Sequence, residues 1–286
     1  LDGDYVTSRH IWDRLQREKQ RDVSIQVERT DTSDSFTVKG RGELHLAVLI
    51  ENMRREGYEL QLSKPRVLFR EIDGVISEPI EHLVIDVNKD YTGCVMDKIG
   101  QRKGELINMI ADSDGYTRLE FHIPARGLLG YRNEFITDTH GTGIMHHSFS
   151  GYCPVKEDMP TRNKGALISM CDGLTTGYAI FNMQARGVFF VGPGEKVYTG
   201  MIVGANNKEK DLELNLCRTK KHSNIRAAGS DEAIKLTPPI IPTIELGLEY
   251  ISDDELMEVT PNHIRFRKRL LDANQRKSAL KSQKKY

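Results

Sequence analysis

Cysteine is scarce in this sequence and scattered along it. The four cysteines, Cys94, Cys153, Cys171 and Cys217, form no C-x-x-C pair. This spacing predicts neither a zinc site nor a disulfide framework, and it fits a reducing cytoplasm. A long apolar run is also missing, which predicts no membrane span and no secretory signal.

The common nucleotide-binding and hydrolase motifs are absent as well. Gly192–Lys196 has neither the spacing of a G-x-x-x-x-G-K-[ST] phosphate loop nor its hydroxyl residue, and no G-x-G-x-x-G follows a predicted strand. Without G-x-S-x-G or H-E-x-x-H, the runs His140–Gly143 and His146-His147 give no hydrolase or zinc signature. The sequence therefore predicts no catalytic residue, no cofactor and no metal in this chain.

Net charge is zero, but the charges are unevenly placed. Lys and Arg number 41, as do Asp and Glu. The segment 263–286 holds nine basic residues and one acid, Asp272, which leaves 32 basic and 40 acidic residues in the preceding body. A body of −8 and a tail of +8 point to a polyanionic partner such as nucleic acid.

The stretch Gly204–Gly229 is the second basic region. Its last third holds four Lys or Arg residues and a histidine without an acid, and Asn and Ser residues favour turns. We interpret it as a loop that leaves a β domain and meets a polyphosphate surface. An ordinary solvated hairpin remains the alternative, since a basic run alone is a weak signal.

Residues 1–76 predict a small α+β unit of the ferredoxin-like kind. A helix capped by Thr7 or Ser8 carries Ile11, Trp12 and Leu15 and ends near Gln20. A second helix is expected at Glu43–Glu56, ended by Gly57, and strands at Val23–Val27, Phe36–Lys39, Tyr58–Leu62 and Arg66–Ile72.

Residues 77–155 repeat the architecture in the order β-α-β-β-α-β, which is ferredoxin-like. Helices are predicted at Tyr91–Arg102 and Ala125–Asp138, and strands at Leu83–Val87, Leu106–Ile110, Tyr116–Ile123 and Gly141–Ser150. Residues 156–286 predict a third, mostly β domain, closed or sandwiched, with many glycine turns and a basic tail that ends in a loose helix.

Several motifs resemble translational GTPases of the elongation factor G type. The runs Gly40–Leu46, Lys64–Val67 and Phe69–Glu71 resemble their third domain. Glu78–Ile80, Gly100–Gly104 and Gly141–Tyr152 resemble their fifth domain, although here the third domain runs straight into the fifth. The runs Ile123–Gly143 and Ile244–Pro261, and the segment from Gly165 onward, are similar to the BipA (TypA) family.

This resemblance implies the C-terminal half of a bacterial ribosome-associated GTPase, linked to stress, low-temperature growth and large-subunit assembly. GTP and Mg²⁺ would belong to a preceding domain, to which Leu1–Val6 would be the link. The expected partners are the ribosome, large-subunit rRNA and the acceptor end of A-site tRNA near the peptidyl-transferase region. The protein is expected to be a cytoplasmic monomer.

The candidate RNA contacts are basic or polar residues of the stretch 204–229, of the tail and of the second unit. They are Lys208, Lys210, Arg218, Lys220, Lys221, His222, Asn224, Arg226, Arg265, Arg267, Lys268, Arg269, Arg102, Lys103, Arg126 and Arg132. Two rival hypotheses stay open: an autonomous enzyme that uses His140 or Cys171, and an adaptor that binds proteins through its sheets.

The missing phosphate loop generates the first testable prediction. This chain alone should not bind GTP, because neither motif that cradles phosphates with backbone amides is present. Isothermal titration calorimetry with GTP and Mg²⁺ should show no stoichiometric heat, and a saturable binding isotherm would contradict the assignment.

Overall fold

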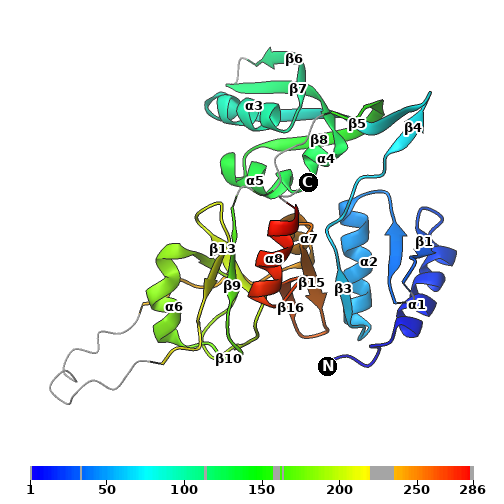
Figure 1. The fold of residues 1–286 in the computed structure, drawn as a ribbon. Helices are drawn as coiled ribbons and strands as arrows, with labels where there is room; N and C mark the ends of the chain where they lie inside the picture. Colours follow the sequence, from blue (N-terminus) through cyan, green and yellow to red (C-terminus); the bar gives the residue numbers. More distant parts are fainter. Residues whose placement is uncertain are drawn as a thin grey trace. The chain divides into compact units, whose positions relative to one another are not determined.

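The computed structural model shows two compact units, each described here by itself (Figure 1). The first consists of residues 1–64 and 162–286, and the second of residues 65–161. The structure describes residues 2–32, 34–112, 115–156, 162, 164–219 and 235–283. The α+β class expected from the sequence is confirmed.

The first unit begins with two helices and a hairpin that share one core. Helix α1 (Ser8–Arg21) starts where the Thr7 hydroxyl accepts a hydrogen bond from the His10 amide. Strands β1 (Gln26–Arg29) and β2 (Phe36–Lys39) pair antiparallel, and α2 (Glu43–Arg55) follows. The shared core contains Leu15, Ile25, Val27, Leu49, Met53 and Tyr58.

A seven-stranded sheet continues the first unit in the order β14-β9-β13-β16-β15-β3, with β11 paired to β13. Its strands are β3 (Leu60–Leu62), β9 (Ala166–Ser169), β11 (Gly187–Phe189), β13 (Met201–Asn206), β14 (Leu212–Leu214), β15 (Glu255–Val259) and β16 (Ile264–Lys268). The sheet is open over the described residues, so the expected alternative of a closed barrel is wrong.

Strand β3 joins this sheet by pairing antiparallel with β15, which lies far along the chain. Leu60 and Leu62 pack against the core that also contains Met257, Val259 and Phe266. The N-terminal α+β segment therefore shares a sheet with the C-terminal segment, although the sequence suggested a self-contained sandwich.

The remaining elements of the first unit cover and extend this sheet. Helix α7 (Ile244–Tyr250) shares a core with α2, and α6 (Gly177–Met183) contributes to a separate one. The 3-10 helix η2 (Gln184–Arg186) follows α6, and β10 (Gly173–Leu174) pairs with β12 (Lys196–Val197). The basic tail contains α8 (Ala273–Gln283), which confirms the expected helix.

The second unit is a ferredoxin-like sheet with strand order β8-β5-β7-β6, to which β4 adds at β5. The strands are β4 (Arg70–Ile72), β5 (Val75–Asn88), β6 (Glu105–Ala111), β7 (Tyr116–Pro124) and β8 (Ile144–Pro154). Its helices are η1 (Lys89–Tyr91), α3 (Thr92–Gln101), α4 (Ala125–Leu128) and α5 (Tyr131–Asp138). The expected β-α-β-β-α-β order is confirmed.

Two details differ from the sequence-based expectation. The helix expected at Ala125–Asp138 is split into α4 and α5, because Gly130 between them has φ +71° in the left-handed region. Strand β4, expected in the first unit, pairs with β5 across the Asp73-Gly74 turn and so lies in the second. The three expected domains, with boundaries at 76 and 155, stay predictions.

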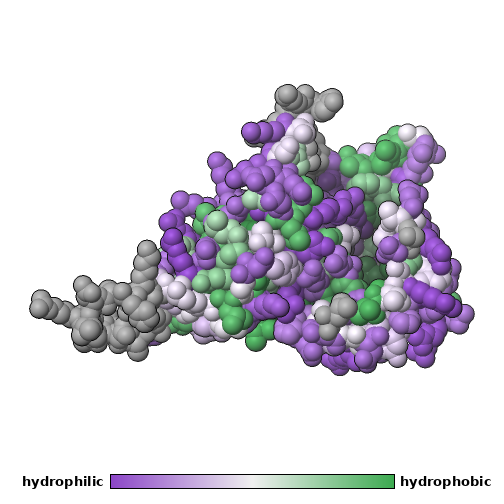
Figure 2. Space-filling view, turned by 60° about the horizontal axis from the view of Figure 1, so that its bottom comes forward, coloured by the Kyte–Doolittle hydropathy of each residue, from purple (hydrophilic) through white to green (hydrophobic). Residues whose placement is uncertain are grey.

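The described surface is mainly polar. On the face drawn in Figure 2, hydrophilic side chains predominate and hydrophobic ones form separate patches. In the part of the chain that the structure describes, no helix is long and apolar enough to cross a membrane.

A partly buried carboxylate sits where α2 meets α7. Glu43 lies in the first turn of α2, and its Oε1 atom is buried without a hydrogen-bond partner among the described residues. Burial, and then the charge of Glu249 on α7, raise the pKa of Glu43 to about 7. Folding therefore favours the protonated form of this acid.

The pH dependence follows from that direction. Because the folded-state pKa lies above the unfolded value, Glu43 costs no stability at low pH and lowers it progressively as pH rises from about 4.5 to about 7. The change Glu43→Gln should raise the free energy of unfolding at pH 8 by about 1–2 kcal/mol, once solvent screening is allowed for, and leave it nearly unchanged at pH 4.5. Urea unfolding at both pH values measures this.

Glu245→Gln is the matched control, since Glu245 also lies in the first turn of a helix, α7, but is exposed. This control should not raise the free energy of unfolding at pH 8, because the exposed Glu245 is already solvated. Equal effects of Glu43→Gln at pH 4.5 and pH 8 would contradict the raised pKa.

Candidate nucleic-acid interface

The stretch 204–229 begins with a strand, a turn and a second strand, and not as a loop. We call this segment, residues 201–214, the hairpin, although β9 lies between its two strands in the sheet. Residues 204–206 complete β13, a turn follows, and Leu212–Leu214 form β14, which pairs parallel with β9. Leu214 and Leu216 are buried. The expectation that the chain leaves the β domain at Gly204 is therefore wrong for its first half, because alternate leucines there face the core.

Asn206 shapes the turn between these strands. Its Oδ1 accepts a hydrogen bond from the Lys208 amide at 3.2 Å, and its Nδ2 donates to the Lys210 carbonyl. The Lys208 carbonyl accepts from the Gly165 amide at 2.8 Å. A Cβ at Gly165 would lie 2.3 Å from the Lys210 carbonyl oxygen, so only glycine allows this close approach.

The turn is also tied to η2, which carries Arg186. The Asn207 amide donates to the Arg186 carbonyl at 2.9 Å, and the Asn207 side chain donates to the Ala185 carbonyl at 3.4 Å. These bonds hold two segments that carry basic side chains next to each other. Three cations, Arg186, Lys208 and Lys210, are exposed there.

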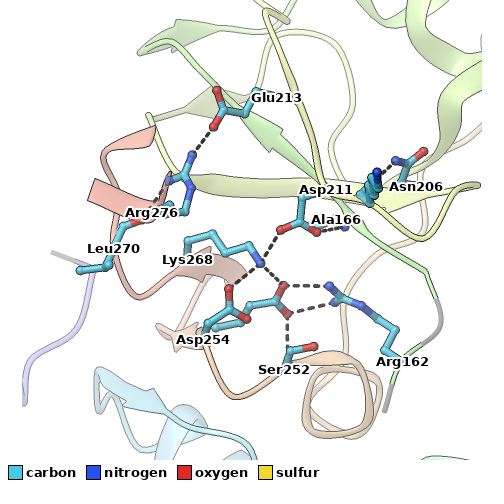
Figure 3. Close-up of polar contacts among 12 residues, drawn as sticks. Arg162, Ala166, Asn206, Asp211, Glu213, Ser252, Asp254, Lys268, Leu270 and Arg276 are labelled. Carbon is cyan, nitrogen blue, oxygen red and sulfur yellow. Dashed lines mark hydrogen bonds and ion pairs between the residues drawn. The ribbon is translucent and has the colours of Figure 1, made fainter. Parts of the chain in front are cut away.

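A buried ammonium fixes the far end of the hairpin (Figure 3). Lys268 is only 3% exposed, and its Nζ lies 2.7 Å from Asp211 Oδ2, 2.9 Å from Asp254 Oδ2 and 2.9 Å from Glu255 Oε1. Burial disfavours the ammonium form, but these carboxylates outweigh that effect and raise the pKa of Lys268 above its ordinary value. The side chain is charged at all physiological pH values.

Asp211 links this cluster to the sheet. Its second oxygen, Oδ1, accepts from the Ala166 amide of β9 at 2.7 Å. Burial alone would raise the pKa of Asp211, but the Ala166 amide and the Lys268 ammonium lower it below its ordinary value. The charge of Asp211 is thus neutralised internally, whereas Lys208, Glu209 and Lys210 of the turn are exposed to solvent.

Two arginines complete the support. Arg162 pairs with the fully buried Glu255 at 2.8 and 2.9 Å in a fork, and its guanidinium lies 4.3 Å from the Tyr250 ring centre. Arg276 of α8 binds Glu213 of β14 at 2.8 Å and the carbonyls of Leu270 and Leu271 (Figure 3). The beginning of the basic tail is therefore fastened to the sheet.

These contacts surround a surface hollow with a volume of about 230 Å³. It is lined by Ala185, Arg186, Asn206, Asn207, Lys208, Lys210, Asp211 and Leu212. The three exposed cations and the exposed side chain of Asn207 are suitable partners for phosphate and sugar oxygens. We take this hollow as the candidate interface and call it the hairpin hollow.

The predicted RNA contacts divide into three groups. Lys208 and Lys210 line the hairpin hollow, and the exposed Arg218, Arg269 and Arg132 lie elsewhere. Arg265 is partly exposed on β16. Five predicted contacts lie outside the described residues: Lys220, Lys221, His222, Asn224 and Arg226.

Several predicted contacts are engaged within the protein. The prediction that Lys268 contacts RNA is wrong, because its buried amine is surrounded by carboxylates and cannot reach an external phosphate. Arg267 pairs with Glu258 at 2.9 Å, and Arg126 pairs with the buried Glu78 at 2.6 Å.

In the second unit, Arg102 donates to Glu134 and to the carbonyls of Gly127 and Leu129, and Lys103 is half-buried with φ +62°. The Arg102 side chain therefore joins the end of α3 to the segment around α4 and to α5, and Lys103 is only partly accessible to an external ligand.

Arg186 was missed by sequence reasoning. It stands alone in a glycine-rich segment, and the pairing of Gly187 with Asn206 and the hydrogen bonds from Asn207 bring it to the hairpin. Among the described residues no three His, Cys, Asp or Glu side chains are grouped so as to hold a metal ion. The side-chain contacts described for Cys171 are with Ser169, Asn215 and Cys217, and so they offer no histidine base for the rival enzyme hypothesis.

Comparison with known proteins agrees with this architecture. Residues 164–273 match the family model of the TypA/BipA C-terminal domain, and residues 75–163 match that of the elongation factor G C-terminus. The chain is 48% identical over 284 residues to the large ribosomal subunit assembly factor BipA of Bacillus subtilis (strain 168).

The chain belongs to the TypA/BipA family. It is also 49% identical over 284 residues to the protein of the same name from Escherichia coli (strain K12), and 49% identical over 267 residues to that of Synechocystis sp.. These alignments cover 99%, 99% and 93% of the chain but 46%, 47% and 45% of the relatives. The chain thus spans about half the length of the curated relatives it matches.

The hairpin hollow generates a direct test with single-stranded RNA. If Lys208 and Lys210 each neutralise one phosphate, the double change Lys208→Ala/Lys210→Ala should weaken binding and flatten the slope of log K against log salt by about 1.4 units. Folding should change by no more than about 0.5 kcal/mol, because both side chains are exposed. Fluorescence anisotropy over a salt series measures the slope.

The matched control is Lys19→Ala/Lys196→Ala, which removes two exposed lysines of the first unit outside the hollow. It should leave the slope unchanged. Equal slopes for the two double variants would exclude the hairpin hollow as an RNA contact.

Proposed function

We propose that this chain is the ribosome-binding part of a BipA-type assembly GTPase and that it contacts large-subunit RNA through the hairpin hollow. The observation that carries the proposal is the combination of 48–49% identity to large ribosomal subunit assembly factors with three exposed cations around one hollow. A ribosomal role for the relatives explains why a cationic surface would be built on a rigid support.

The physical chemistry of the hollow favours RNA over a protein partner. Lys and Arg neutralise phosphates, and the exposed side chain of Asn207 can bind sugar and base edges. The carboxylate that lines the hollow, Asp211, is paired with Lys268 and so does not repel a phosphate strongly, and the exposed Glu209 of the same turn is not among the lining residues. The rigid turn would let the cations meet RNA without first ordering a flexible segment.

The finer assignments rest on the resemblance. We propose that Arg218 and the following basic residues Lys220, Lys221 and Arg226 approach the acceptor end of A-site tRNA near the peptidyl-transferase region. His222 would stack on a base. We also propose a cytoplasmic monomer that acts in large-subunit assembly and in the response to stress and low temperature. GTP hydrolysis with Mg²⁺ would belong to the part of the relatives that this chain does not match.

Binding to purified ribosomal subunits tests the proposal. The chain should bind the large subunit more tightly than the small one, and added salt should weaken that binding. Lys220→Ala/Lys221→Ala should lower the affinity for the large subunit and flatten its salt slope by somewhat under two units. Sedimentation of labelled chain with each subunit over a salt series provides the measurement.

The double variant Lys19→Ala/Lys196→Ala again serves as the control of equal charge change. Equal affinity of the chain for both subunits would overturn the proposal. If Lys220→Ala/Lys221→Ala kept full affinity and the same slope, the RNA contact would fall to the hairpin hollow or the basic tail.

A further inference from the structure

Two thiols far apart in the sequence meet beside the hairpin. Cys171 follows β9, and Cys217 follows β14. Hydrogen bonds join the segments in which they lie: Met170 donates to the Leu214 carbonyl at 3.0 Å, and Thr176 donates to the Leu216 carbonyl at 2.9 Å. These bonds hold the chain around Cys171 against residues 214–216, directly before Cys217.

Side-chain contacts place the sulfurs next to each other. Asn215 Oδ1 accepts from Cys171 Sγ at 3.3 Å and from the Cys217 amide at 3.0 Å. A Cβ built at Gly173 would lie 3.1 Å from Cys217 Sγ, so this sulfur lies against the backbone two residues beyond Cys171. The Cys171 side chain is also among the groups that raise the pKa of the Cys217 thiol.

We propose that Cys171 and Cys217 form a dithiol that a peroxide converts to an intramolecular disulfide. Neighbouring strands lie about 4.8 Å apart, which is within the Cα separation that a disulfide spans. Both cysteines are half-buried, so a small oxidant can reach them without unfolding of the sheet. Cys94 and Cys153 belong to the second unit and serve as internal references.

The chemistry needs only the peroxide. The Cys171 thiolate attacks one peroxide oxygen, the O–O bond breaks, and a sulfenic acid and one water result. Cys217 then attacks the sulfenic sulfur, the S–O bond breaks and a second water leaves. The protein loses two hydrogens, both sulfurs are oxidised, and the peroxide is reduced to water.

The two sulfurs have different roles in this sequence. Burial, and then Cys171, raise the pKa of Cys217 to about 11, so Cys217 stays a thiol at neutral pH. In the proposed sequence Cys171 is the attacking sulfur and Cys217 is the resolving one. Oxidation would covalently fix Arg218, whose carbonyl already accepts a hydrogen bond from the Thr176 hydroxyl.

Peptide mapping tests the disulfide. The reduced chain is treated with hydrogen peroxide, its remaining thiols are blocked with N-ethylmaleimide, and it is digested with trypsin without reductant. We expect a linked pair of peptides, 165–186 with 211–218, that dithiothreitol separates. Cys94 and Cys153 should be recovered mainly as blocked thiols.

Variants separate the outcomes. Cys171→Ser and Cys217→Ser should each abolish the linked peptides. Cys217→Ser should still form the sulfenic acid at Cys171, which dimedone traps, and Cys171→Ser should not form it. Cys94→Ser should leave the linked pair unchanged. Independent over-oxidation of Cys171 and Cys217 in the wild-type chain without linked peptides would overturn the proposal, and this outcome does not depend on whether any variant folds.

Discussion

The buried ammonium of Lys268 holds together four segments that are distant in sequence. It binds Asp211 at the hairpin, Asp254 before β15 and Glu255 at its start, while Arg162 binds the other side of Glu255. A buried charge is tolerated only when its partners satisfy it, and removing one partner of such a cluster typically costs about 3–5 kcal/mol. The cluster acts through geometry: it fixes where the sheet, the hairpin and the beginning of the tail meet.

This cluster also fixes the position of the exposed turn that carries Lys208 and Lys210. Asp211 binds both Lys268 and the β9 amide of Ala166, so the residue that ends the turn cannot move independently of the sheet. Lys208 and Lys210 then project from a backbone whose carbonyls are already used by Gly165 and Asn206. Internal pairing compensates the charge of Asp211, and the exposed Lys208 and Lys210 face the outside together with Glu209.

The sequence predicted the periodic elements well and the role of individual cations poorly. The ferredoxin-like order of the second unit follows from apolar alternation such as Leu83, Ile85 and Val87, all fully buried. Lys268 was read as part of a basic run. Its place two residues after the buried Phe266 on β16 was the available signal, since alternate strand residues share a face.

Other features could not be predicted, because they depend on contacts distant in sequence. The pairing of β3 with β15 and the approach of Arg186 to Asn207 leave no local pattern in the chain. The split between α4 and α5 did have a local signal, Gly130, but an isolated glycine inside a helical pattern is often tolerated.

The β3–β15 ladder also has a consequence for synthesis of the protein. The second unit, residues 65–161, has its own sheet and core and can complete its fold as soon as it is made. Strand β3 precedes it but has to wait for β15, which is made long afterwards. Until then the backbone N–H and C=O groups of β3 have no strand partner and could pair with another strand. Contacts between residues so far apart in sequence also form slowly. The nascent chain therefore carries an unfinished first unit through most of its translation, and the last strands to be made decide when that unit closes.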